Sequence, residues 1–292
     1  LLDRPITSTS GFTSVFANVG SMRNRGWEVA LRTLNLVPAD DDGLRWTTEL
    51  NFAANRNEVT GLFNDEPFST GERSINRVAV GEPIGAFYTV KFLGVDPETG
   101  DAIYEDLDGN NRIGTADRQI VGSPHPDWTG GLGNTLELAG FDLRAFLQVS
   151  QGAEVFNAMR LFSDAGGWYL DNQFGHVMNR WRQPGDETDV PRASYDGLSG
   201  ARTISSRFIE DGSYVRLQEV TLGYRLPGRL ARVAGMDGAR LFVSGHNLHT
   251  WTDYLGFSPD VNSNGVSNAA LGTDFYAYPV ARTLTVGIRG TW

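Results

Sequence analysis

The sequence predicts an all-β fold: an antiparallel, up-and-down transmembrane β-barrel segment that is incomplete on its own and carries long external loops. Three observations lead to this prediction. Stretches of about ten residues alternate apolar and polar side chains, which is the period of a β-strand. Short and long connections between these stretches alternate along the chain. The final strand ends on Trp292, a residue type suited to the boundary between hydrocarbon and water.

The composition agrees with strands and excludes several classes of protein. The chain of 292 residues holds 35 glycines and 11% aromatic residues, as expected for strands joined by turns. It has no cysteine, which excludes disulfides, cysteine-ligated zinc and thiol catalysis. Its net charge of -10 argues against nucleic acid as a partner, because a phosphate backbone is bound by clustered lysine and arginine. No apolar run approaches the roughly 18 to 20 residues of a membrane-spanning helix.

The first two strands are expected at residues 27–36 and 44–55. The alternation of the first is broken near its end, because Leu34 and Leu36 are in phase with polar residues. The sequence Asp-Asp-Asp-Gly at 40–43 predicts a tight turn between the two strands. Together these features indicate a hairpin.

Five more strands follow the same pattern. Residues 128–138 and 141–151 form a second expected hairpin, with Ala139-Gly140 as its turn. Further strands are expected at 213–227, 239–248 and 278–292, and the last places Leu284, Val286 and Ile288 on one face. The long connections lie at 56–127, 152–212 and 249–278.

The order of the connections separates a barrel from a sandwich. In an up-and-down antiparallel sheet, successive connections lie at opposite ends, so all the long ones gather at one rim. Bacterial outer-membrane barrels have this asymmetry, with short periplasmic turns and long external loops. The strands of a soluble β-sandwich also have one apolar face, but its Greek-key connections need not sort by length. A secreted, glycan-binding β-sandwich, with or without calcium, is the alternative.

The polar faces of the strands indicate a wide barrel. Small or polar residues recur there, among them Thr129, Gly131, Thr285 and Gly287. An eight-stranded barrel fills its interior with side chains, whereas this lining suits a water-filled or plugged lumen. Seven strands cannot close a wide barrel. We therefore expect residues 1–292 to be the C-terminal part of a larger barrel, without its plug and N-terminal strands.

Several motifs follow one another along the chain in a recognisable order. They are the run FIEDGSYVRLQEVTLGYRLP at 208–227 and the stretches NVGSMRNRGWE at 18–28, RWRQPGDETDVPR at 180–192, GHNLH at 245–249 and Tyr278-Pro279. Together they resemble the SusC/RagA class of TonB-linked outer-membrane transporters, a class of TonB-dependent receptors, and the run at 208–227 is similar to a signature near the end of that class. Two departures stand out: the chain ends on Trp292 where the class usually ends on Phe, and no plug or TonB-contacting segment is recognised.

The resemblance implies a protein of the bacterial outer membrane that is not an enzyme. It implies import of a bulky nutrient, typically an oligosaccharide (glycan) or peptide, through a barrel of about 22 strands with an internal plug. It also implies two protein partners, a SusD-class surface lipoprotein over the external loops and the TonB system acting through the N-terminal part. Outer-membrane lipid would surround the barrel, and no cofactor would be required.

An acidic stretch at 106–117 has the spacing of a calcium loop. Oxygen ligands at positions 1, 3, 5, 7 and 12 would come from Asp106, Asp108, Asn110, the backbone carbonyl of Arg112, and Asp117. The stretch departs from the EF-hand pattern, because glycine is at position 4 and Asn111 would have to take the tight conformation. It therefore predicts either a structural calcium site or a turn held by its own side-chain hydrogen bonds.

The aromatic residues fall into two groups. Trp168, Tyr169 and Trp181 lie in the second long connection, where they would either stack on a sugar substrate or pack the loops together. The others lie near the ends of expected strands, where the aromatic girdles of a membrane barrel belong: Trp27, Trp46, Trp128, Trp251 and Trp292.

Catalysis has little support in the sequence. Of the four histidines, only His246 and His249 are closely spaced, and they would fall on opposite faces of one strand. No glycine-rich phosphate loop follows a strand, and no serine has the context of a nucleophile elbow.

Overall fold

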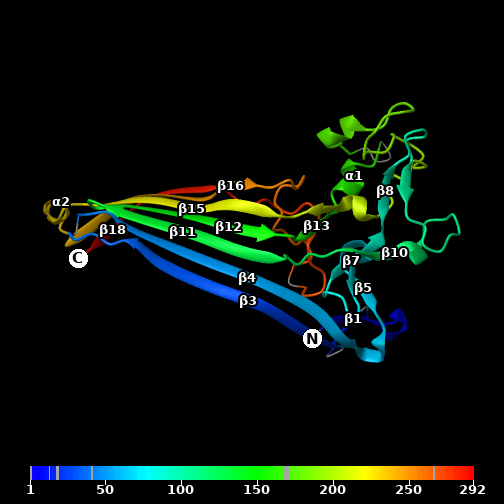
Figure 1. The fold of residues 1–292 in the computed structure, drawn as a ribbon, viewed down its shortest axis with the longest axis horizontal. Helices are drawn as coiled ribbons and strands as arrows, with labels where there is room; N and C mark the ends of the chain where they lie inside the picture. Colours follow the sequence, from blue (N-terminus) through cyan, green and yellow to red (C-terminus); the bar gives the residue numbers. More distant parts are fainter. Residues whose placement is uncertain (1, 13, 18–19, 41, 167–170, 266) are drawn as a thin grey trace.

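A long, twisted sheet forms one end of the molecule, and the long connections gather at the other end (Figure 1). The structure is a computed structural model, and it describes residues 2–12, 14–17, 20–40, 42–166, 171–265 and 267–292. Within these residues, no helix has the length and apolar character needed to cross a membrane.

The long sheet has seven antiparallel strands in the order β18-β16-β15-β12-β11-β4-β3. Their bounds are β3 Gly20–Leu36, β4 Arg45–Leu62, β11 Trp128–Leu138, β12 Phe141–Gln151, β15 Tyr214–Arg225, β16 Gly238–Trp251 and β18 Thr283–Thr291. Each strand pairs with the next of the seven along the chain, which confirms the up-and-down arrangement. All seven predicted strands are present, and β11 and β12 begin and end at the predicted residues.

Strands β3 and β4 differ from the prediction in length and regularity. Their additional residues, 20–26 and 56–62, are mostly polar and so lack the alternation on which the prediction depended. A bulge between Leu34 and Leu36 pairs Leu36 with Trp46 and returns it to the face of Leu31. This bulge explains the broken alternation at the end of β3.

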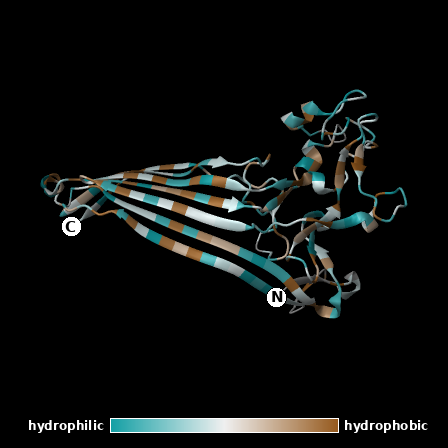
Figure 2. Cartoon of the chain, in the orientation of Figure 1, coloured by the Kyte–Doolittle hydropathy of each residue, from teal (hydrophilic) through white to brown (hydrophobic). Residues whose placement is uncertain are grey.

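Apolar and polar residues alternate along the strands of the sheet (Figure 2). One face of the sheet, here called the outward face, is apolar and uncovered. The register aligns apolar residues into rows, one of which contains Trp46, Leu136, Leu143, Leu222, Val243 and Val286. On β18, Leu284, Val286 and Ile288 are 73%, 80% and 60% exposed. Across the described ranges no second protein layer covers this face, so the β-sandwich alternative is wrong. An uncovered apolar face is what a bilayer-spanning barrel requires.

Aromatic residues border the outward face at both ends. Trp128 and Trp251 lie at the ends of their strands near the long connections, whereas Trp46 and Trp292 lie near the short ones, as predicted. Trp27 lies inside β3, because β3 continues past the apolar band. The 11 residues of β11 span about 36 Å, or roughly 28 Å when tilted by about 40°, which matches the apolar band of outer-membrane barrels.

The opposite face of the sheet, here called the lumen face, is polar and rich in glycine. Arg45 and Glu137 form an ion pair across β4 and β11 at 3.8 Å. The ring of Phe242 lies over Gly287, where a Cβ atom would collide with it. Polar pairs and glycines thus recur on this face, as the sequence predicts, and the width of the complete barrel stays a prediction.

The connections sort by length as predicted. The short ones lie at 37–44, 139–140 and 226–237, and the last contains a short helix, α2 Gly228–Val233, where a turn was expected. The long ones, residues 63–127, 152–213 and 252–282, lie together at the other end and are here called the loop cap (Figure 1). Near the N-terminus, β1 Leu2–Pro5 pairs with β2 Ser14–Ala17.

The loop cap contains small sheets of its own. The largest consists of β5 Phe68–Thr70, β6 Asn76–Val78, β7 Ala86–Val90 and β10 Arg118–Gly122. Two others consist of β13 Glu154–Asn157 with β14 Ile209–Asp211 and β17 Thr273–Asp274, and of β8 Phe92–Val95 with β9 Ala102–Tyr104. A single helical turn, α1 Arg160–Ser163, follows β13.

The hydrophobic core of the protein lies in the loop cap. One buried cluster joins the first and second long connections through Ile75, Phe87, Phe156, Ala158, Leu161 and Phe208. A second cluster joins β4 and the first connection to the third through Val59, Val78, Ile84 and Ala269. Burial of large apolar side chains is the main stabilising term in folding. The three long connections therefore fold as one unit.

Candidate functional site

The predicted calcium loop brings its carboxylates together. Oxygen atoms of Asp106, Asp108 and Asp117 lie within 4.8 Å of one another. Ligand oxygens around calcium lie about 2.3 to 2.6 Å from the ion, so three oxygens at this separation fit one coordination sphere. This is the one such group found among the described residues.

Hydrogen bonds within the loop hold these carboxylates in place. Asp106 accepts the backbone N–H groups of Gly109 and Asn111 at 2.8 and 2.7 Å, and Asn111 has φ 60°, the tight conformation that the spacing demands. Asp117 is fully buried and accepts the N–H of Gly114 at 2.7 Å. This hydrogen bond lowers the pKa of the Asp117 carboxyl, whereas burial raises it. Further backbone N–H donors shift the balance, so the pKa lies below its ordinary value. Both interpretations of the loop, self-bonded turn and calcium site, agree with this geometry.

We propose that the loop binds calcium, and we expect the ion to stabilise the cap of the full-length receptor. At a hundred times its dissociation constant, a ligand adds about 2.7 kcal/mol to the free energy of unfolding. Calcium added after chelation should slow proteolysis of the cap. Asp108→Asn should abolish this protection, because the amide keeps an acceptor for Asn110 but loses the charge.

The matched control is Asp96→Ala. Asp96 accepts the N–H of Glu98 at 2.8 Å in another turn of the same connection, outside the carboxylate group. This variant should keep the response to calcium. Equal protease resistance of the unaltered receptor with calcium and with chelator would show that the loop is a self-bonded turn.

The predicted substrate-stacking aromatics are only partly described. Trp168 and Tyr169 lie outside the described residues. The Trp181 indole N–H donates to the carbonyl of Pro97 at 2.9 Å, and its ring lies against Gly100, which has φ 76°. This residue thus joins two long connections, and a substrate contact through it stays a prediction.

A cavity of about 440 Å³ lies where the cap meets the lumen face. Asn57 of β4, Asp127 before β11 and Glu154 of β13 contribute to its lining. Glu154 accepts the N–H of Ser123 at 2.6 Å, and burial raises the pKa of the Glu154 carboxyl. A solute that enters the lumen from the cap would pass these carboxylates and amides, which suit hydroxyl or ammonium donors.

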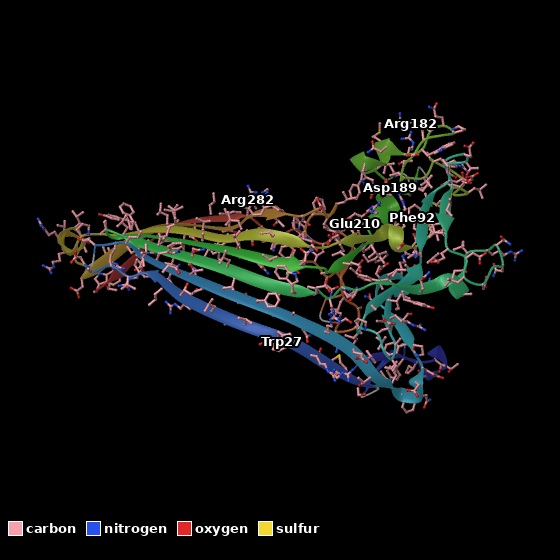
Figure 3. The ribbon with its side chains drawn as sticks, in the orientation of Figure 1. Trp27, Phe92, Arg182, Asp189, Glu210 and Arg282 are labelled. Atoms are coloured by element: carbon pink, nitrogen blue, oxygen red, sulfur yellow. The ribbon has the colours of Figure 1, made fainter. Side chains whose placement is uncertain are left out.

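Sequence reasoning missed a buried charge network in the cap. Asp164 is 1% exposed and accepts from Arg160 Nε at 2.7 Å and from His176 Nε2 at 2.8 Å. Arg160 also donates to Glu210 at 2.9 Å, and Arg207 Nη2 lies 3.5 Å from Asp164. The network borders a cavity of about 470 Å³ that Phe92 and Asp189 also line (Figure 3). The sole local signal was the spacing of Arg160 and Asp164 by four residues.

The histidines give no support to a metal centre. His246 pairs with Glu219 on the lumen face, and its Nε2 atom forms a hydrogen bond with the Ser244 hydroxyl at 3.1 Å. His249 pairs with Leu217 and packs against the edge of Trp251. The two rings thus lie on opposite faces, as expected from their positions in one strand.

Comparisons with known proteins cover nearly the whole chain. It is 35% identical to TonB-dependent receptor P3 of Formosa agariphila over 99% of the chain and 30% of the relative. It is 25% identical to TonB-dependent receptor SusC of Bacteroides thetaiotaomicron over 93% of the chain and 26% of that relative. Among solved structures, it matches the RagAB peptide transporter with a TM-score of 0.81 and 27% identity, over 99% of this chain and 31% of that one. No protein-family model matches the sequence. The chain thus spans about a third of the length of the relatives it matches.

Proposed function

Because the chain belongs to the SusC/RagA class of TonB-dependent receptors, we propose that it supplies barrel strands and external loops to an importer of bulky nutrients. Proteins of this class lie in the bacterial outer membrane, and so does this chain. The relatives named above are receptors and transporters, in agreement with a role other than catalysis.

One observation carries the proposal: a sheet with an apolar outward face and a polar lumen face continues, at one end, into a folded cap. The outward face suits lipid, and the lumen face offers a polar route, with the cavity that Asp127 and Glu154 help to line at its outer end. The cap positions side chains from three distant connections over that route. A barrel wall that served only as an anchor would need neither the cap nor the cavity.

The proposed substrate is an oligosaccharide or a peptide. Both carry the hydrogen-bond donors that the carboxylates at the barrel rim would accept. The proposed partners are a SusD-class surface lipoprotein over the loop cap and the TonB system, which would act on parts of the receptor outside this chain. Membership of the class supports both partners.

Substitution of the rim carboxylates tests the transport route. In cells that produce the full-length receptor, Asp127→Asn with Glu154→Gln should reduce uptake at low substrate concentration about tenfold or more, because each charged hydrogen bond contributes about 1.5 to 3 kcal/mol. Uptake of labelled oligosaccharides and peptides gives the measurement, and deletion of the receptor identifies which of them it imports. Asp42→Asn at the opposite rim is the matched control. Unchanged uptake by the double variant would place the route elsewhere.

A further inference from the structure

The helix α2 lies at the rim of the short connections (Figure 1). Ala239 of β16 belongs to the outward face, yet it is 4% exposed, whereas Leu241 two residues on is 44% exposed. Gly290, the partner of Ala239 on β18, has the thioether of Met236 where a Cβ atom would lie. The connection between β15 and β16 therefore folds onto the apolar side of the sheet.

One side of α2 is buried against the sheet, and the opposite side is exposed. Ala231 is fully buried, and its carbonyl accepts the N–H of Met236 at 3.1 Å. Leu230 and Val233 are 58% and 87% exposed, and their spacing of three residues places them on one side of the helix. Two large apolar side chains at this exposure continue the apolar outward face beyond the strands.

Two arginines lie beside these apolar residues on α2. Arg229 and Arg232 are exposed and have the same spacing of three residues. In the described part of the chain, neither guanidinium group forms an ion pair or hydrogen bond. An arginine fork presents donors that match phosphate oxygens in number and geometry.

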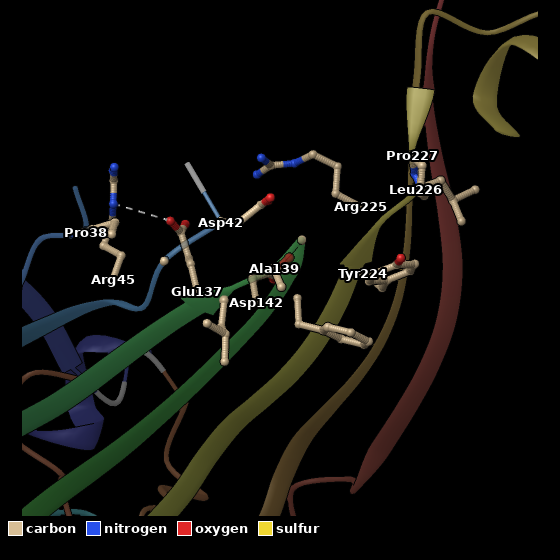
Figure 4. A pocket seen from close by; sticks show the side chains of 14 residues that line it. Pro38, Asp42, Arg45, Glu137, Ala139, Asp142, Tyr224, Arg225, Leu226 and Pro227 are labelled. Atoms are coloured by element: carbon tan, nitrogen blue, oxygen red, sulfur yellow. Dashed lines mark ion pairs between the residues drawn. The ribbon is translucent and has the colours of Figure 1, made fainter. Parts of the chain in front are cut away.

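The lumen side of the same rim has a different arrangement. A groove of about 760 Å³ opens at this rim between the short connections, and Arg45, Asp142 and Arg225 line it from the lumen face (Figure 4). Arginines on the lumen face near this groove have acidic neighbours: Arg45 pairs with Glu137 at 3.8 Å, and Arg240 Nε donates to Asp142 at 2.8 Å. On the outward side, Arg229 and Arg232 form no such pair among the described residues, so their guanidinium groups are available to anions from outside the chain.

We propose that α2 is a phospholipid-binding site, in which Leu230 and Val233 enter the membrane interface and Arg229 and Arg232 bind the phosphates of acidic phospholipids. Short connections of outer-membrane barrels face the periplasm, so the site belongs to the periplasmic leaflet. Its depth is fixed by Trp292, an exposed aromatic at the same rim beside Gly290. A short basic and apolar helix at this depth has the composition of an interfacial anchor.

Hydrogen exchange in the full-length receptor tests this site independently of the substrate. The reporters are amides such as Ala231 and Ala234, which are bonded within the turn. These amides should exchange about 25-fold more slowly in nanodiscs of phosphatidylcholine with about a third phosphatidylglycerol than in nanodiscs of phosphatidylcholine alone. Each arginine near an anionic surface contributes about a fivefold change in the exchange rate, and the two contributions multiply. Arg229→Gln with Arg232→Gln should remove this difference.

The matched control is Arg225→Gln, which removes a charge from the same rim. Arg225 lines the groove on the lumen side (Figure 4), so this variant should keep the response to acidic lipid. Equal exchange in both lipids would overturn the proposal, as would a response that survives the double substitution. Loss of the response in Arg225→Gln would also overturn it, because net charge would then explain the effect.

Discussion

Arginine in place of Leu284 should strongly destabilise the full-length barrel in a bilayer. Leu284 lies on the outward face between the two aromatic girdles, where a charged side chain meets hydrocarbon. The cost of arginine near the bilayer midplane is about 2 to 4 kcal/mol. Because no second protein layer covers Leu284 among the described residues, the effect reports chiefly on the lipid. Urea titration in vesicles, followed by the migration of folded and unfolded receptor on gels, gives the measurement.

Thr285→Arg is the control for this prediction. Thr285 is the next residue of β18, at nearly the same depth, but its side chain lies on the lumen face opposite Ser244. Arginine there meets a polar lining, so the free energy of unfolding should change by less than about 1 kcal/mol. Equal costs for the two variants would contradict the assignment of one face of β18 to lipid and the other to the lumen, and a larger cost for Thr285→Arg would mean that the faces are exchanged.

The barrel strands were predictable because their signal is local. In β11 and β12 one face meets hydrocarbon and the other a polar lumen, so alternation alone gives their bounds. The same rule failed where that contrast disappears. Before Trp27 in β3 and after Ala54 in β4, the strands extend past the apolar band toward the loop cap, and polar residues occupy both of their faces. The helix α2 was missed because six residues cannot display a helical period.

The loop cap was not predictable, because its core depends on contacts between distant parts of the chain. Phe87 and Phe208 meet in one cluster although about 120 residues separate them, and no periodicity links them. The same holds for the charge network, in which Asp164 contacts Arg207 from another part of the same connection. The acidic loop at 106–117 was visible because its ligands lie close together in sequence. Local spacing thus identified one candidate site, whereas folding of the cap created the others.

Alanine in place of Asp164 should unfold the loop cap locally while the barrel stays inserted. Burial alone lowers the pKa of Arg160, but the carboxylates of Asp164 and Glu210 outweigh burial and raise that pKa. Arg207 has less compensation, because burial and the neighbouring Arg160 lower its pKa. Removal of Asp164 leaves the buried guanidinium groups of Arg160 and Arg207 without their shared carboxylate, and Arg160 keeps its contact with Glu210. Breaking a buried ion pair in this way costs about 3 to 5 kcal/mol.

The measurement is limited proteolysis of intact cells that carry the full-length receptor. In the Asp164→Ala variant, residues 152–213 should be cleaved at least tenfold faster and import should fall, with the heat-resistant gel migration of the barrel unchanged. Asp253→Ala removes an exposed acidic residue of the same cap and should alter none of these. Because the cap core joins three connections, cleavage should also appear in 63–127 and 252–282. Cleavage confined to 152–213 would contradict the conclusion that the cap folds as one unit.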